Sequence, residues 1–238
     1  MKVAQSLGIK VFADGADLAD IRALATDPFI AGFTTNPSLM RKAGVPHYEK
    51  FARAVVELIG DRPVSFEVFS DNEDEMGRQA RLIASWGVNV YVKVPVTFTD
   101  GMRTDKLIRC LTEAGVKLNV TALTTVRQVA WVTEALAGTA GAIVSVFAGR
   151  IADSGRDPVP IIAAARQIVE LKSGVELLWA SPRELLNVVQ ANSAGCHIIT
   201  VTRTLLEKLT LLGRDLDEVS LDTVRMFHDD AEQAGFHL

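Results

Sequence analysis

Short apolar runs, several of them rich in β-branched residues, recur along this chain at intervals of roughly 20 to 33 residues, which is room for one strand, one helix and two loops. This repeat constrains the fold more than any other feature. The runs that we interpret as strands are residues 10–13, 31–34, 64–69, 88–94, 117–121, 142–147, 176–180 and 197–201. The repeat predicts eight strands that alternate with helices.

The segments between several of these runs have the periodicity of amphipathic helices. The clearest are residues 49–59, 73–86, 105–113, 126–136 and 160–171. Gly60, Gly87, Gly115 and Gly174 each follow such a segment, as expected for the C-terminal cap of a helix. These signals support the division into βα units.

Eight βα units favour a closed (β/α)8 TIM barrel of the α/β class. No linker or low-complexity stretch divides the 238 residues, so we expect residues 1–238 to form a single class I aldolase-type barrel domain. An open doubly wound sheet also alternates strands and helices. The glycine-rich phosphate loop expected after its first strand is missing here, and the barrel is therefore favoured.

Composition narrows the possible partners. The formal net charge is -4 and the basic residues are scattered, so we expect no nucleic acid partner. Lys10 interrupts the apolar amino-terminal stretch, and the longest apolar run, residues 140–149, is too short to cross a bilayer. We therefore expect a cytoplasmic protein with no membrane partner. Cys110 and Cys196 lack the spacing of a zinc or redox pair and are interpreted as packing residues.

Polar residues interrupt the apolar strands near their carboxyl ends. Five strands carry such residues, namely Asp14, Glu67, Lys93, the pair Asn119 and Thr121, and Ser145, while Asn36 and Ser181 lie just past two further strands. A barrel strand is buried on both faces, so such residues are costly unless they are paired or functional. In a TIM barrel the carboxyl ends of the strands build the active site.

Each of these residues also has a purely structural interpretation. Glu67 and Lys93 could form an ion pair between neighbouring strands, and Asn36 before Pro37 could cap a helix. Asp14 before Gly15 could begin a turn, and a buried serine or threonine is often a satisfied core hydroxyl. Their coincidence at one end of one barrel favours function.

Lys93 is the sharpest single signal because Val92 and Val94 flank it and Pro95 follows. Desolvation favours the neutral form of an amine, which can attack a carbonyl and form an imine. The imine then acts as an electron sink while a neighbouring carbon–carbon bond breaks. Asp14 and Glu67 are the carboxylates available to move protons.

Sequence motifs extend this pattern over nearly the whole chain. They are Phe-Ala-Asp at 12–14, Thr-Thr-Asn-Pro-Ser-Leu at 34–39, Val-Lys-Val-Pro-Val-Thr at 92–97, Lys-Leu-Asn-Val-Thr-Ala at 117–122, Ser-Val-Phe-Ala-Gly-Arg at 145–150, Ala-Ser-Pro-Arg at 180–183 and Ala-Gly-Cys at 194–196. Together they resemble the transaldolase family in its short form, which includes the fructose 6-phosphate aldolases.

The resemblance implies a role for each matching residue. The implied catalytic residues are Lys93 as the Schiff-base nucleophile, Asp14 as the proton carrier, and Glu67 and Thr121 as holders of the water used to make and hydrolyse the imine. The implied substrate-binding residues are Thr35, Asn36, Asn119, Ser145 and Phe147, with Arg150, Ser181 and Arg183 at the phosphate. The resemblance implies no cofactor and no metal.

Two positions bear on the branch of the family. The aldolase branch tends to carry glutamine at the position of Glu67 and tyrosine at that of Phe147, so both residues point to a transaldolase acting on small-molecule sugar phosphates. A fructose 6-phosphate aldolase is the alternative. Val146, Pro182 and Gly15 depart from the family pattern, and two of them flank the proposed phosphate site, so another anion such as a sulfonate remains an alternative. A catalytically silent binding barrel is disfavoured by the site residues.

Two further expectations concern metals and assembly. His47, His197, His228 and His237 show no ligand-like grouping in the sequence, which disfavours metal-dependent chemistry. Residues 221–238 contain an amphipathic helix with Phe227 and Phe236 available for burial. It could pack on its own barrel, whereas short transaldolases resemble one another in forming rings in which this helix reaches a neighbour. We therefore expect a homo-oligomer, a pentamer or decamer.

Overall fold

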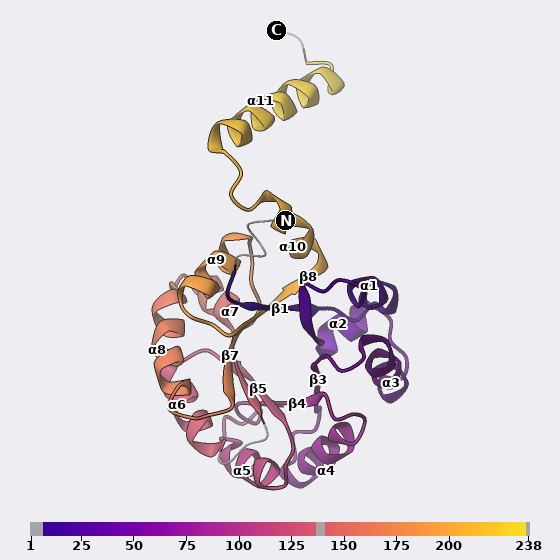
Figure 1. Cartoon of the computed structure of the whole chain (residues 1–238), viewed down its shortest axis with the longest axis vertical. Helices are drawn as coiled ribbons and strands as arrows, with labels where there is room; N and C mark the ends of the chain where they lie inside the picture. Colours follow the sequence, from indigo (N-terminus) through magenta and orange to yellow (C-terminus); the bar gives the residue numbers. More distant parts are fainter. Residues whose placement is uncertain (1–6, 137–140, 237–238) are drawn as a thin grey trace.

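The computed structural model describes residues 7–136 and 141–236. Eight parallel strands close into one barrel, with each strand beside its sequence neighbours and β8 paired with β1 (Figure 1). The strands are β1 Lys10–Asp14, β2 Ile30–Thr34, β3 Val64–Glu67, β4 Val90–Pro95, β5 Leu118–Leu123, β6 Ala142–Val146, β7 Val175–Trp179 and β8 Ile198–Thr202. The predicted (β/α)8 barrel and its eight strands are confirmed, and the open-sheet alternative is wrong.

Helices surround the barrel. The predicted ones correspond to α3 Tyr48–Ile59, α4 Glu73–Ala84, α5 Asp105–Glu113, α6 Val126–Ala135 and α8 Val159–Val169. Sequence periodicity missed α1 Leu18–Leu24, α2 Pro37–Lys42, α7 Ala148–Asp153, α9 Leu186–Ser193 and α10 Arg203–Lys208. These helices have six to eight residues, about two turns, which is too short for an apolar stripe to repeat.

Two of the four glycine caps are confirmed. Gly60 is the C-cap of α3 and Gly115 follows the C-cap of α5, with φ of 63° and 78°, the left-handed region of φ that glycine adopts readily. Gly174 is also left-handed, but α8 already ends before Glu170. Gly87 is not left-handed. A side chain at this position would instead be crowded, because a Cβ there would lie 2.8 Å from Asn89 Oδ1. Both of these cap predictions are wrong.

The barrel interior is filled below its carboxyl-terminal mouth. Phe12, Ile143, Leu178, Ala180 and Ile198 form one buried apolar cluster contributed by strands on one side of the barrel and the residue after β7. The adjacent strand has Gly32, and a Cβ there would lie 2.6 Å from Phe12 Cζ. The polar residues at the mouth therefore lie against a closely packed apolar layer.

The terminal helix α11, Leu216–Gln233, projects away from the barrel (Figure 1). None of its residues is buried. The alternative in which this helix packs on its own barrel is therefore wrong, and the helix begins five residues earlier than the predicted segment. Residues 237–238 lie outside the described residues. Among the described residues, no helix has both the length and the apolar character needed to cross a membrane.

Candidate active site

A cavity of about 430 Å³ opens at the carboxyl ends of the barrel strands. Its lining consists of Asp14, Thr34, Asn36, Pro37, Ser38, Leu39, Glu67, Lys93, Asn119, Thr121, Ala122, Ser145, Phe147, Arg150, Leu178, Ala180, Ser181 and Thr200. The tertiary structure thus brings together all the predicted site residues except Thr35 and Arg183. They come from elements that are far apart in the sequence.

Lys93 lies on β4 with its amine at the cavity wall. The residue is 6% exposed, as expected from its apolar neighbours. Its Nζ donates to the carbonyl oxygen of Thr35 at 2.9 Å and lies 3.1 Å from Glu67 Oε2. Glu67 and Lys93 are register partners on β3 and β4, so the strand pairing itself brings these side chains together. The ion pair that the sequence allowed is present, and it is part of the cavity.

Asp14 ends β1 and bonds to a hydroxyl group. Thr34 Oγ1 donates to Asp14 Oδ1 at 2.7 Å, and the hydroxyl of Thr200 contacts that of Thr34. Burial raises the pKa of Asp14, against the lowering effects of the nearby Lys93 charge and the Thr34 hydrogen bond. Thr34 and Thr200 were missed by the sequence reasoning, although each is a hydroxyl residue near the end of an apolar strand.

The amide of Asn119 is oriented from two sides. Asn119 Nδ2 donates to Ser65 Oγ at 3.0 Å, and Ser145 Oγ donates to Asn119 Oδ1 at 2.6 Å. Two residues along β5, the Thr121 hydroxyl is buried at the cavity and has no hydrogen-bond partner among the described residues. A fixed amide and an available hydroxyl can together bind a polyhydroxylated molecule or water.

Asn36 combines the two interpretations that the sequence left open. Its Oδ1 accepts from Leu39 N at 2.9 Å and so caps α2, in which Pro37 occupies the first turn. The same residue lines the cavity. Thr35 lies outside the lining and contributes its carbonyl oxygen to Lys93 instead.

Another part of the cavity lining is formed by Arg150 on α7 and Ser181 after β7. Ser181 has a φ of 61°, and a Cβ on Gly149 would lie 1.6 Å from the Ser181 carbonyl oxygen. Only glycine allows α7 to approach that strained residue. Arg183 lies outside the lining, and its Nε donates to Asp153 Oδ1 at 3.0 Å as part of an ion pair.

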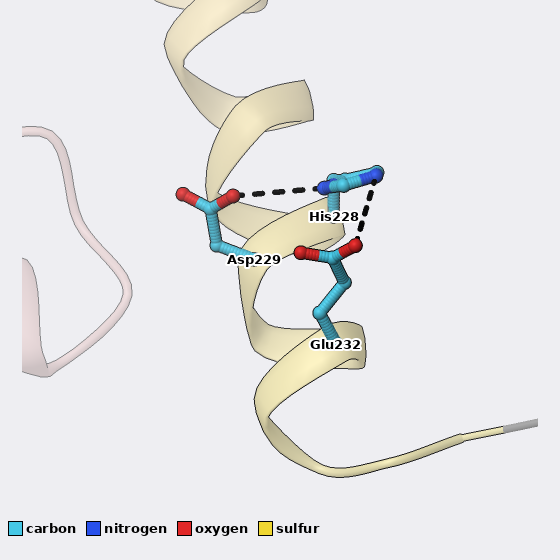
Figure 2. Close-up of side chains that lie close together, drawn as sticks. All are labelled: His228, Asp229 and Glu232. Carbon is cyan, nitrogen blue, oxygen red and sulfur yellow. Dashed lines mark ion pairs between the residues drawn. The ribbon is translucent and has the colours of Figure 1, made fainter.

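The expectation that no histidine has a ligand-like grouping is wrong for His228. On α11, its Nδ1 lies 3.6 Å from Asp229 Oδ1 and its Nε2 3.9 Å from Glu232 Oε1 (Figure 2). All three side chains are exposed on a helix that projects away from the barrel. His47 precedes α3, and His197 Nδ1 accepts from Leu177 N at 2.9 Å. His237 lies outside the described residues.

Comparison with known proteins places the sequence in a family. The sequence model of a family described as "Transaldolase/Fructose-6-phosphate aldolase" matches residues 11–238. A "Probable transaldolase 2" of Listeria monocytogenes is 35% identical over 205 residues, covering 84% of this chain and 88% of that protein. A "Probable transaldolase" of Oceanobacillus iheyensis is 36% identical over 203 residues, covering 84% and 90%.

Solved structures support the fold at lower sequence identity. A putative phosphonomutase from Burkholderia cenocepacia covers 98% of this chain and 96% of its own, with a TM-score of 0.58 and 12% identity. A putative lyase/mutase from the same organism covers 99% and 88%, with a TM-score of 0.59 and 14% identity. At such identities the likeness concerns the barrel alone.

Proposed function

The chain belongs to the transaldolase/fructose-6-phosphate aldolase family, and we propose that it is a transaldolase that moves a dihydroxyacetone unit from a ketose phosphate to an aldose phosphate. The donor would be fructose 6-phosphate or sedoheptulose 7-phosphate. The observation that carries this proposal is the buried Lys93 amine, which lies in a cavity with two carboxylates, Glu67 and Asp14. Such an enzyme would serve the pentose phosphate pathway in the cytoplasm.

The first step is formation of the imine. Lys93 Nζ gives one proton to Glu67 and attacks the C2 carbonyl carbon of the ketose, and a second proton of the nitrogen then passes to the carbonyl oxygen. With the proton held by Glu67 added, this oxygen leaves as water and the iminium forms. Glu67 Oε2 is 3.1 Å away and can accept that proton and return it to the departing oxygen. The available hydroxyl of Thr121 binds the water.

The second step breaks the C3–C4 bond. Its electron pair flows into the iminium, while Asp14 takes the proton of the C4 hydroxyl and the aldehyde leaves. Because burial raises the pKa of Asp14, its carboxyl can hold this proton until an acceptor arrives. The carbanion then adds to the acceptor aldehyde, and Asp14 returns the proton to the new alkoxide. Hydrolysis of the imine releases the product ketose.

The remaining lining residues bind the substrate. Asn36, Asn119 and Ser145 hold the hydroxyls of the dihydroxyacetone unit, and Arg150 and Ser181 hold the anionic end. Arg183 joins them only by exchanging Asp153 for the phosphate, since its guanidinium is engaged with that carboxylate. Thr35 supports the site through its carbonyl bond to Lys93 rather than by contacting substrate.

The acceptor requirement is carried by Phe147, which places an apolar ring in the cavity between β6 and α7. A phenolic hydroxyl there would position a proton and water that release free dihydroxyacetone. Because Phe147 lacks this hydroxyl, the carbanion persists until an acceptor aldehyde binds. A fructose 6-phosphate aldolase, which releases free dihydroxyacetone, is the alternative reaction of this site.

The test is to measure glyceraldehyde 3-phosphate released from fructose 6-phosphate without added metal, with and without erythrose 4-phosphate. Release that needs the acceptor and disappears in Lys93→Ala supports transaldolase. Release without acceptor identifies an aldolase. No release in either case rejects this donor, and a sulfonated ketose in parallel would then reveal a different anion.

Assembly is proposed on a separate observation. Helix α11 exposes Leu216, Val224 and Phe227, which are 80%, 60% and 63% accessible, and none of its residues is buried against the barrel. Large apolar side chains left open on one helix are typical of a surface that another protein covers. We propose a homo-oligomer, a pentamer or decamer, in which α11 contacts a neighbouring copy.

A further inference from the structure

Tyr48, the first residue of α3, bonds to both backbone groups of Glu67. Its hydroxyl donates to the Glu67 carbonyl oxygen at 2.9 Å and accepts from the Glu67 N–H at 2.8 Å. Tyr48 does not line the cavity and was not among the residues singled out from the sequence. We propose that Tyr48 is a positioning residue that holds Glu67 against Lys93, an inference that rests on the proposed function.

The position of this contact follows from where the sheet ladder ends. The register of β2 and β3 pairs Phe33 with Val64 and Thr34 with Ser65, and the last bond runs from Thr35 N to Ser65 O at 3.3 Å. In a parallel ladder the next bond would join the Glu67 N–H to the Thr35 carbonyl. That bond is replaced by the Tyr48 hydroxyl.

The replacement releases the Thr35 carbonyl for a second use. This oxygen accepts from Lys93 Nζ at 2.9 Å, while Glu67 Oε2 contacts the same amine at 3.1 Å. One hydroxyl therefore satisfies two backbone groups of Glu67 and leaves Thr35 free to orient the nucleophile. Without it, the Glu67 N–H and carbonyl would lose their partner at a site where burial makes that costly.

The Tyr48 ring is itself held in place. It packs edge-on against Phe69 and Phe66, with ring centroids 4.6 and 6.3 Å apart, and lies 5.8 Å from Trp86. Burial raises the pKa of Tyr48, so the hydroxyl stays protonated and can donate and accept at any working pH. The aromatic cluster thus fixes the hydroxyl, and the hydroxyl fixes the end of β3.

The test is a double-mutant cycle between Tyr48→Phe and Glu67→Gln, read as kcat, KM and the rate at which borohydride traps the imine. Tyr48→Phe keeps the ring packing and removes the hydroxyl. We expect it to lower kcat about ten- to a hundredfold with little change in KM, because the loss is one of geometry at the reacting amine. In the Glu67→Gln background the same change should lower kcat no further.

An equal fall in both backgrounds, or no fall in the wild type, would overturn the inference. Tyr91→Phe is the matched control, because the chain has only two tyrosines and Tyr91 lies outside the cavity lining. Failure of the wild type to trap any ketose would instead reject the proposed function. The two failures are therefore distinguishable.

A second variant tests the inference if Tyr48→Phe fails to fold. In the Tyr91→Phe chain, Tyr48 is the single tyrosine, so biosynthetic fluorotyrosine changes the donor and acceptor strength of that hydroxyl alone. We expect kcat to change when Glu67 is present and to stay constant in Glu67→Gln. A change in both backgrounds, or in neither, contradicts the positioning role.

Discussion

Glu67 and Lys93 are partners in the register of β3 and β4, and their charged atoms lie 3.1 Å apart with side chains only 19% and 8% exposed. Removing one member of such a pair leaves an uncompensated charge in a poorly hydrated site. The pair therefore affects both the stability of the barrel and its chemistry, and these two effects can be separated by substitution.

Lys93→Met should destabilise the protein by about 3 kcal/mol, because Glu67 then remains charged without its partner. Adding Glu67→Gln should recover part of that loss, since the unpaired charge disappears. Urea denaturation of the two single variants and the double variant measures this. A double variant as unstable as the sum of the two single variants would contradict the coupling, and all variants with Lys93→Met should fail to trap a ketose with borohydride.

Asp14 should make stability depend on pH. Its pKa is raised in the folded state by burial, so the folded chain binds the proton more tightly than the unfolded chain does. The stabilisation that the protonated Asp14 gives the folded state is therefore complete below the pKa of Asp14 in the unfolded chain. It is lost as the pH rises through the pKa of Asp14 in the folded chain. Asp14→Asn, which cannot ionise, should therefore gain stability over the wild type at about pH 8 and lose that advantage near about pH 4.

The same Asp14→Asn variant should lower kcat by about two to four orders of magnitude, because no carboxyl remains to carry the proton. Chemical denaturation at the two pH values gives the stability difference, and the transferase assay gives kcat. A stability difference that does not change with pH would show that Asp14 does not titrate with folding.

The two arginines near the proposed anion site should differ in how much they contribute to substrate binding. Arg150 lines the cavity, whereas Arg183 is engaged by Asp153. Arg150→Ala should raise KM for a ketose phosphate about tenfold or more and leave an unphosphorylated ketose little affected. Arg183→Ala should have the smaller effect, and Asp153→Asn should lower KM by releasing Arg183. Equal effects of both alanine variants would mean that Arg183 leaves Asp153 when substrate binds.

Gly149→Ala should disrupt the proposed anion site. The added Cβ would lie 1.6 Å from the Ser181 carbonyl oxygen, so either α7 or the strained Ser181 must move. We expect a destabilisation of about 1–3 kcal/mol and a higher KM for phosphorylated ketoses. Gly15→Ala is the control, because a Cβ there meets nothing within 4 Å. Matching values for the two variants would reject this explanation of Gly149.

Removal of residues 214–238 should convert the proposed oligomer into a monomer, because α11 buries none of its residues on its own barrel. Light scattering after size-exclusion chromatography measures the mass. Phe227→Asp tests the exposed apolar ring alone, and Glu232→Gln on the same helix is its control. A monomeric wild type, or an unchanged mass after truncation, would exclude α11 as the contact.

The sequence by itself determined the architecture of this protein. The spacing of its apolar runs specifies eight strands, because a strand buried on both faces must be continuous and apolar, and helical periodicity between the runs specifies the longer helices. Lys93, Glu67 and Asp14 were also recognisable from the sequence, since a charge inside such a run needs a partner or a function. Helices of about two turns, such as α2 and α7, escaped because they are too short to repeat an apolar stripe.

The tertiary structure decided which atoms meet. No residue pattern encodes side-chain directions and loop paths. These decide that Asp153 engages Arg183, that α11 leaves the barrel, and that the Tyr48 hydroxyl ends the β3 ladder. Periodicity reports which face of an element is apolar. It does not report distances between residues from different elements, and the hydrogen bonds of the site require those distances to within a few tenths of an ångström.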